Sequence, residues 1–168
     1  SAVRRRVFSQ ALSGGERFQM TRKRYVLMMA VTAALTGLGL PLTAQSTETY
    51  KARLGWVPTT GAQRADVTGK GSATATLSGK TLSITGSFEG LVAPATAARL
   101  HRGVAKGARG YPIFDLTVTK ATSGTISGSV ALTPDQLESL KQGSLYIQLH
   151  SEKGVAPDGS NLWGWFLR

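Results

Sequence analysis

The stretch that most directly indicates the fold is ATATLSGKTLSITGSF, residues 73–88. Small or aliphatic residues alternate with Thr and Ser on both sides of the polar link Ser78-Gly79-Lys80. Such a two-residue period places one face of a strand against a core and the other face towards solvent. A short link that contains Gly is typical of a tight turn. Residues 73–77 and 82–88 are therefore expected to form an antiparallel hairpin.

Short alternating runs of the same kind occur along the rest of the chain, at residues 50–56, 113–118, 126–130, 145–150 and 162–167. Many short strands with frequent turns favour an antiparallel sandwich or barrel. We predict an all-β fold, an antiparallel Greek-key-like β-sandwich with one short connecting helix.

The helix is expected directly after TPDQ at residues 133–136. Thr is a good N-cap, Pro is favoured at the first helical position, and Gln three residues after the cap completes a capping box. Leu137 and Leu140 supply an apolar stripe, and Gly143 can end the helix in a left-handed conformation.

The N-terminal part has the features of a targeting segment. In residues 20–44, a basic start precedes an apolar run of 16 residues, which Pro41 and small residues up to Ala44 follow. We expect a signal peptide cleaved near Ala44; the alternative, an uncleaved membrane anchor, needs roughly 20 apolar residues. Residues 1–19 are interpreted as a translated upstream or disordered extension, and residues 45–168 as one domain, periplasmic or secreted.

The charge distribution excludes some function classes. Residues 1–44 contain seven basic residues and one acid, whereas residues 45–168 contain 13 basic and eight acidic residues that are scattered singly. A nucleic-acid surface would show clustered Lys and Arg with interleaved aromatics, so no nucleic-acid partner is expected. The chain has no Cys, which excludes disulfides and thiolate metal sites.

The order of these features resembles the CHRD (chordin-type) domain, from about Tyr50 to Leu167. The segments that carry the resemblance are Leu54-Gly55 with Val57-Pro58, AARLHRG at 97–103, GYPI at 110–113, Leu132-Thr133 with the helix, and GSLYIQLHS at 143–151. Two positions depart from the family pattern: Arg99 stands where a histidine is usual, and Trp163 where an arginine is usual. The resemblance implies a β-sandwich outside the cytoplasm, in an exported bacterial form, and no established enzymatic reaction.

The chain has two histidines, His101 and His150, and they are the candidate metal ligands. Alternation places His150 on one face with Tyr146, opposite the aliphatic residues of its strand, and places His101 with Arg99. If the two strands are neighbours, the imidazoles meet on an outer face and could bind copper or zinc. Asp115, Glu152 or Asp158 could add a third ligand, whereas the charge of Arg99 and Arg102 would repel a cation. The alternative is that each histidine only bonds a nearby turn.

Trp163 and Trp165 lie two residues apart, on one face of the last strand, with Trp56 as a possible neighbour. Together with Tyr146 and Arg99 they are candidate ligand-binding residues, because an exposed aromatic strip can stack on sugar rings. The alternative is that the tryptophans only pack and close the sandwich against the helix.

No catalytic constellation is recognisable. Ser151, His150 and Asp158 are close in sequence, but neighbouring strand residues point to opposite faces, and no nucleophile elbow is present. We therefore predict a non-catalytic binding module of the bacterial envelope or periplasm, with an envelope protein or a polysaccharide as partner and no resident cofactor. The alternatives are a small copper- or zinc-handling protein and a carbohydrate-binding module. Contact with a membrane is expected only through the signal segment before cleavage.

Overall fold

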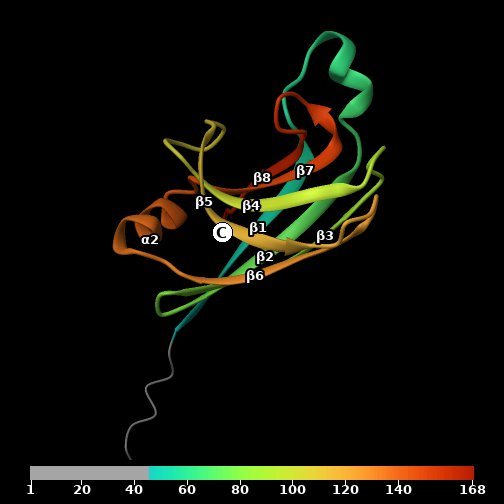
Figure 1. Cartoon of the computed structure of the whole chain (residues 1–168). Helices are drawn as coiled ribbons and strands as arrows, with labels where there is room; N and C mark the ends of the chain where they lie inside the picture. Colours follow the sequence, from blue (N-terminus) through green and yellow to red (C-terminus); the bar gives the residue numbers. More distant parts are fainter. Residues whose placement is uncertain (1–45) are drawn as a thin grey trace, which may run out of the picture. The chain divides into compact units, whose positions relative to one another are not determined.

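The computed structural model describes residues 46–168 (Figure 1). The extension expected at residues 1–19 and the signal peptide expected at residues 20–44 lie outside these described residues. Within the described part, no helix combines the length and the apolar character that a membrane-spanning helix needs.

The described residues contain eight strands, one α-helix and one short 3-10 helix. In chain order these are β1 (Thr47–Trp56), η1 (Gly61–Asp66), β2 (Lys70–Ser78), β3 (Thr81–Glu89), β4 (Ala95–Gly103), β5 (Gly110–Val118), β6 (Gly124–Ala131), α2 (Pro134–Lys141), β7 (Leu145–Val155) and β8 (Ser160–Trp165).

The eight strands close into an antiparallel barrel with the order β1-β2-β3-β6-β5-β4-β7-β8 (Figure 1). The predicted all-β class and the antiparallel pairing are confirmed. The predicted Greek-key-like sandwich is wrong, because the strands close into a barrel. Two strands that change partner along their length join the sheets. β1 pairs with β2 from Thr47 to Leu54 and then with β8 through Gly55 and Trp56. β5 pairs mainly with β4 but reaches β6 at its end. Each of these two junctions, β1–β8 and β5–β6, is made by two residue pairs.

The predicted hairpin of residues 73–88 is confirmed as β2 and β3. Leu77 pairs with Leu82 and Ala75 with Ile84, and all four side chains are buried in the barrel interior. The interior is filled by such alternating residues from every strand; its largest fully buried members are Tyr50, Leu54, Leu82, Ile84, Leu100, Ile126, Leu140, Leu145, Ile147, Leu149 and Phe166.

The predicted connecting helix is confirmed as α2. The Thr133 side chain accepts a hydrogen bond from the Gln136 amide, and the Gln136 side chain accepts one from the Thr133 amide, which is the expected capping box. After the helix, Gly143 has a φ of 71°, a value that glycine adopts without strain. Leu140 is fully buried and Leu137 packs against the core.

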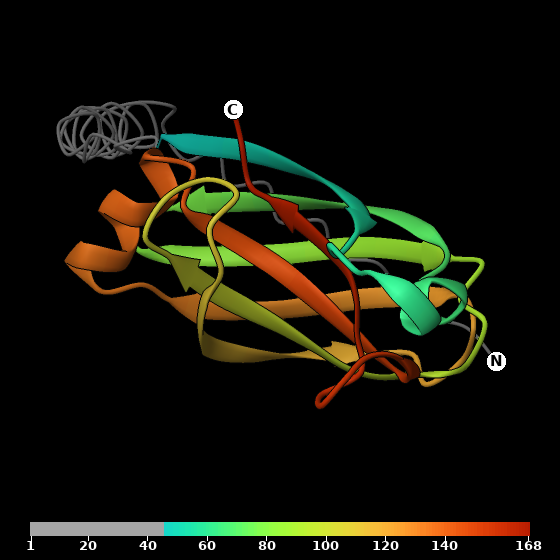
Figure 2. The ribbon, with the colours of Figure 1, turned by 90° about the horizontal axis from the view of Figure 1, so that it is seen from above.

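Two elements are absent from the predicted set of strands and helices. β4 is rich in Ala, a residue with low strand propensity, so its central place in the sheet comes from pairing on both sides with β5 and β7. η1 has no buried residue and no capping side chain. Figure 2 shows η1 at one end of the barrel, and α2 with the β4–β5 loop at the other.

Candidate functional site

The outer face of β7 is buried, although it points away from the barrel interior. Tyr146, Gln148 and His150 alternate with the core residues of this strand, yet their exposed fractions are 0%, 3% and 2%. The expectation that strand alternation leaves one face wet is therefore wrong for β7. Other side chains and loops form a second packed layer on this outer face, and the candidate site lies within it.

Aromatic side chains form one side of this layer. Trp163 and Trp165 of β8 pair with Gln148 and Tyr146 of β7, so they share the outer face as predicted. The Tyr146 ring stacks on Trp165, with 4.9 Å between centroids, and meets Trp163 edge-on. Both tryptophans are half-buried and pack against each other at 67°. Trp56 does not join them: its indole lies under Arg64 and donates to the Gly69 carbonyl.

The β4–β5 loop covers the same layer from one end. The Gly110 amide donates a hydrogen bond of 3.0 Å to the Tyr146 hydroxyl, and the Arg109 guanidinium lies 5.5 Å from the centre of the Trp163 ring. Gly110 is required here because a Cβ at this position would overlap the carbonyl oxygen of Arg102 on β4. Sequence reasoning did not single out this glycine as part of the site.

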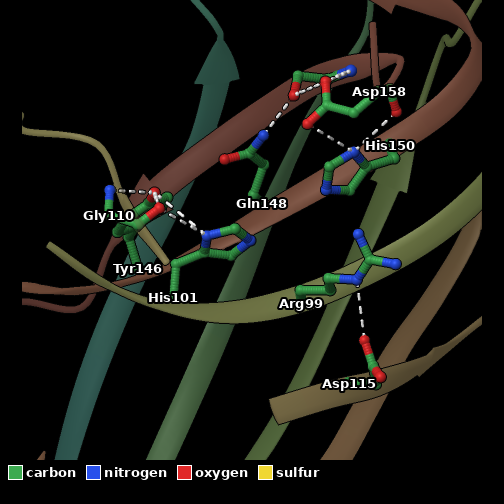
Figure 3. A network of polar contacts seen from close by, with 9 residues as sticks. Arg99, His101, Gly110, Asp115, Tyr146, Gln148, His150 and Asp158 are labelled. Carbon is green, nitrogen blue, oxygen red and sulfur yellow. Dashed lines mark hydrogen bonds and ion pairs between the residues drawn. The ribbon is translucent and has the colours of Figure 1, made fainter. Parts of the chain in front are cut away.

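The two histidines meet on this face, as the strand parity predicted for neighbouring strands. β4 and β7 are paired, with His101 opposite Tyr146 and His150 opposite Ala97. The imidazole centroids are 6.4 Å apart and the ring planes differ by 28°. Both rings are buried, and Figure 3 shows that the free edge of each ring points towards the other.

The Nδ1 atom of each histidine has a hydrogen-bond partner. That of His150 lies 3.1 Å from the Asp158 carbonyl oxygen, which only accepts, so His150 Nδ1 is the donor and its Nε2 has a free lone pair. The Nδ1 atom of His101 lies 3.3 Å from the Tyr146 hydroxyl and 3.4 Å from the Gly110 oxygen (Figure 3). Both Nε2 atoms are buried without a hydrogen-bond partner. Two unsatisfied imidazole nitrogens are thus held side by side.

The charged neighbours of the pair are Arg99 and Asp158. The Arg99 Nε atom donates to Asp115 at 2.9 Å, so Asp115 is held on β5 and is not a third ligand. The Asp158 carboxylate lies 3.7 Å from His150 Nδ1, on the side of the ring opposite to the free Nε2 (Figure 3). Among residues 46–168, no group of three or more His, Cys, Asp or Glu side chains is placed to hold a metal ion.

A hydrogen-bonded chain positions the β7–β8 turn beside His150. The Gln148 amide donates to the Ser160 hydroxyl, which in turn donates to the Asp158 carboxylate at 2.6 Å. Burial raises the pKa of Asp158, but the hydrogen bonds from Ser160 outweigh this effect and the pKa is lowered. Gln148 and Ser160 were not predicted as site residues, because their roles depend on contacts across two strands.

Ser151, His150 and Asp158 do not form the hydrogen-bonded chain of a serine hydrolase. The Ser151 hydroxyl donates to the Lys153 carbonyl and accepts a hydrogen bond of 2.9 Å from Asn161. The Nδ1 atom of His150 bonds to the Asp158 carbonyl, and His150 makes no hydrogen bond to Ser151. The observed partners agree with the parity argument that these neighbours face opposite sides of β7.

The buried histidines make stability depend on pH. Burial lowers the pKa of both His101 and His150; the hydrogen bonds to Gly110 and Asp158 oppose this, and the Arg99 charge adds to it. As the pH falls below about 6.5, the unfolded chain therefore binds protons that the folded chain does not. Above this pH, the neutral histidines make their full contribution to the free energy of unfolding. It is expected to decrease below it by up to about 1.4 kcal/mol per pH unit for each histidine, until the pH reaches the lowered folded-state pKa.

Urea denaturation at pH 7.5, 6.5 and 5.5 measures this dependence. The double variant His101→Gln/His150→Gln has no histidine, so its stability should change little over the same range. The carboxyl groups of Asp158 and Glu48 have lowered pKa values and act at lower pH. Equal pH slopes for the two proteins would contradict the prediction.

The fold and the site together define a small antiparallel β-barrel domain with a buried histidine and tyrosine layer on the outside of one wall. A protein-family model for the CHRD domain matches residues 56–159, more than half of the chain. The protein therefore belongs to the CHRD domain family, as the resemblance predicted. The match includes both histidines and Tyr146 but ends before Trp163 and Trp165. No curated protein and no solved structure matches the chain.

Proposed function

We propose that this CHRD domain is a non-catalytic metal-binding module of the bacterial envelope, in which His101 and His150 bind one copper or zinc ion. The observation that carries the proposal is the pair of buried Nε2 atoms, which face each other and have no partner. A buried polar nitrogen without a partner costs about 1–3 kcal/mol, and a metal ion bound to its lone pair removes this cost. Imidazole nitrogen is a preferred ligand of both metals.

The surroundings of the two rings support the same function. Metal-ligating histidines usually donate their other nitrogen to a carbonyl or carboxylate, which holds the ring and its tautomer. His150 does so through the Asp158 carbonyl, and His101 Nδ1 is held between the Gly110 carbonyl and the Tyr146 hydroxyl. The lowered pKa of each ring keeps it neutral near pH 7, and the neutral ring is the form that binds a metal.

The aromatic strip favours sugar binding less. Trp163 and Trp165 are turned edge to face and are half-buried against Tyr146, instead of presenting two exposed parallel rings. These rings form one side of the packed layer that contains the histidines. Placement in the envelope is supported by the apolar segment at residues 20–44, which has the pattern of a signal peptide.

Metal titration of the purified protein tests the function. We expect one ion per chain and a higher thermal midpoint, because a ligand at about 1,000 times its Kd adds about 4 kcal/mol to the free energy of unfolding. The double variant His101→Gln/His150→Gln should lose the whole effect, while Lys106→Gln in the exposed loop should keep it. If copper in both oxidation states, zinc and nickel all leave the midpoint unchanged, the proposed function is wrong.

A further inference from the structure

The number of ligands on this face decides which ion the site suits. Among the described residues, the two imidazoles are the groups of this face that are suited to ligate a metal and have a buried nitrogen without a partner. The Asp115 carboxylate is bound to Arg99, and the Asp158 carboxylate lies behind His150, where it accepts hydrogen bonds from Ser160. Zinc takes four ligands and at least three from protein in its usual sites, so two imidazoles leave it underligated. A closed-shell univalent ion such as copper(I) is stable with two nitrogen ligands in line.

The spacing of the rings fits one ion between them. A bond from imidazole nitrogen to a metal is about 2.0 Å, so rings that share an ion in line have centroids about 6 Å apart. The observed separation of the His101 and His150 centroids is 6.4 Å. The two Nε2 atoms face the space between the rings and have no exposed surface, so an ion there would be shielded from water (Figure 3).

The cost of desolvation also favours a univalent ion. The charges near the pair are mixed, because Arg99 and Asp158 act on both rings with opposite sign and Arg99 is itself paired with Asp115. A divalent ion loses more hydration than a univalent ion when it enters a buried site. This effect acts against zinc and copper(II) more strongly than against copper(I).

We propose that the pair formed by His101 and His150 is selective for copper(I) over divalent metals, an inference that rests on the proposed metal-binding function. The site then acts as a buried two-coordinate holder for the reduced ion. Arg99 lies on β4 opposite Gln148, two residues before His101, so this face of β4 supplies no third ligand at that position.

The test is an anaerobic competition titration of the purified protein with copper(I) against a chromogenic chelator. Silver(I) serves as a univalent probe without redox chemistry, and zinc and copper(II) are titrated separately. We expect one copper(I) or silver(I) ion per chain and an affinity for copper(I) at least roughly 100-fold above that for zinc. His101→Gln and His150→Gln should each weaken copper(I) binding by roughly 100-fold. X-ray absorption of the copper(I) form should show two nitrogen neighbours.

A second variant is designed to gain affinity for a divalent ion. Arg99→His removes the charge and adds a third imidazole on the same face, so its zinc affinity should rise at least roughly 10-fold. Arg102→His makes the same chemical change on β4 at a position of opposite parity and should leave zinc affinity unchanged. Equal zinc affinity of these two variants would contradict the role of Arg99.

The outcomes separate the two proposals. Zinc or copper(II) binding as tight as copper(I) would overturn the selectivity and leave the metal-binding function intact. Absence of binding by every ion tested would overturn both.

Discussion

Truncation of Tyr146 to Ala is expected to lower the free energy of unfolding by about 3–5 kcal/mol, as much as truncation of a large core residue. Tyr146 points out of the barrel, but it is fully buried, and its ring packs against His101 and Trp165 at centroid distances of 5.0 and 4.9 Å. Its hydroxyl also accepts the Gly110 amide, which would be left without a partner. Urea denaturation followed by circular dichroism measures the loss.

Two controls separate packing from the hydroxyl. Tyr146→Phe keeps the ring and should cost only about 1–2 kcal/mol. Tyr111→Ala, which removes an exposed tyrosine from strand β5, should cost less than about 1 kcal/mol. If Tyr146→Ala costs no more than Tyr111→Ala, the outer layer is not the second core described above.

Replacement of Asn161 by Ala is expected to lower the free energy of unfolding by about 3 kcal/mol. The Asn161 side chain is fully buried and connects three segments. Its amide nitrogen donates to the Asp66, Lys153 and Ser151 oxygens at 2.9–3.1 Å, and its oxygen accepts the Thr68 amide at 3.2 Å. The variant leaves several of these buried groups unpaired, and each costs about 1–3 kcal/mol unless water replaces the side chain.

Hydrogen exchange locates the effect of this change. The Thr68 amide should exchange faster in Asn161→Ala, since it loses its acceptor. The exchange rate of the Ile84 amide in the barrel wall should change only as much as the change in the global free energy of unfolding requires. Ser83→Ala, which removes an exposed hydroxyl, is the matched polar control and should change stability by less than about 0.5 kcal/mol. A loss below about 1 kcal/mol in Asn161→Ala would show that the network contributes little.

The sequence predicted the local structure of the barrel well where short-range physics determines it. The hairpin of residues 73–88 follows from alternation around a glycine turn, and the helix after Thr133 follows from its capping residues. In both cases the interacting groups are only a few residues apart. β4 was harder to predict, because an Ala-rich segment becomes a strand only when strands on both sides supply its hydrogen bonds.

The candidate site could be predicted in part. Strand parity placed His101 and His150 on an outer face, and Trp163 and Trp165 on a common face, because side-chain direction in a strand depends only on the residue count. Parity could not show that this face is covered. Burial of the layer requires the β4–β5 loop, the β7–β8 turn and the side chains of β8 to meet over β7, and those segments are distant in the chain.

The sequence by itself determined most of the strands, the single α-helix, the family and the faces on which the histidines and tryptophans lie, since each depends on local periodicity or on short patterns. Only the tertiary structure decided that the sheets close into a barrel, that β4 is a strand between β5 and β7, and that both Nε2 atoms are buried without a partner. These features depend on which distant strands pair, and a periodic pattern is compatible with more than one pairing order.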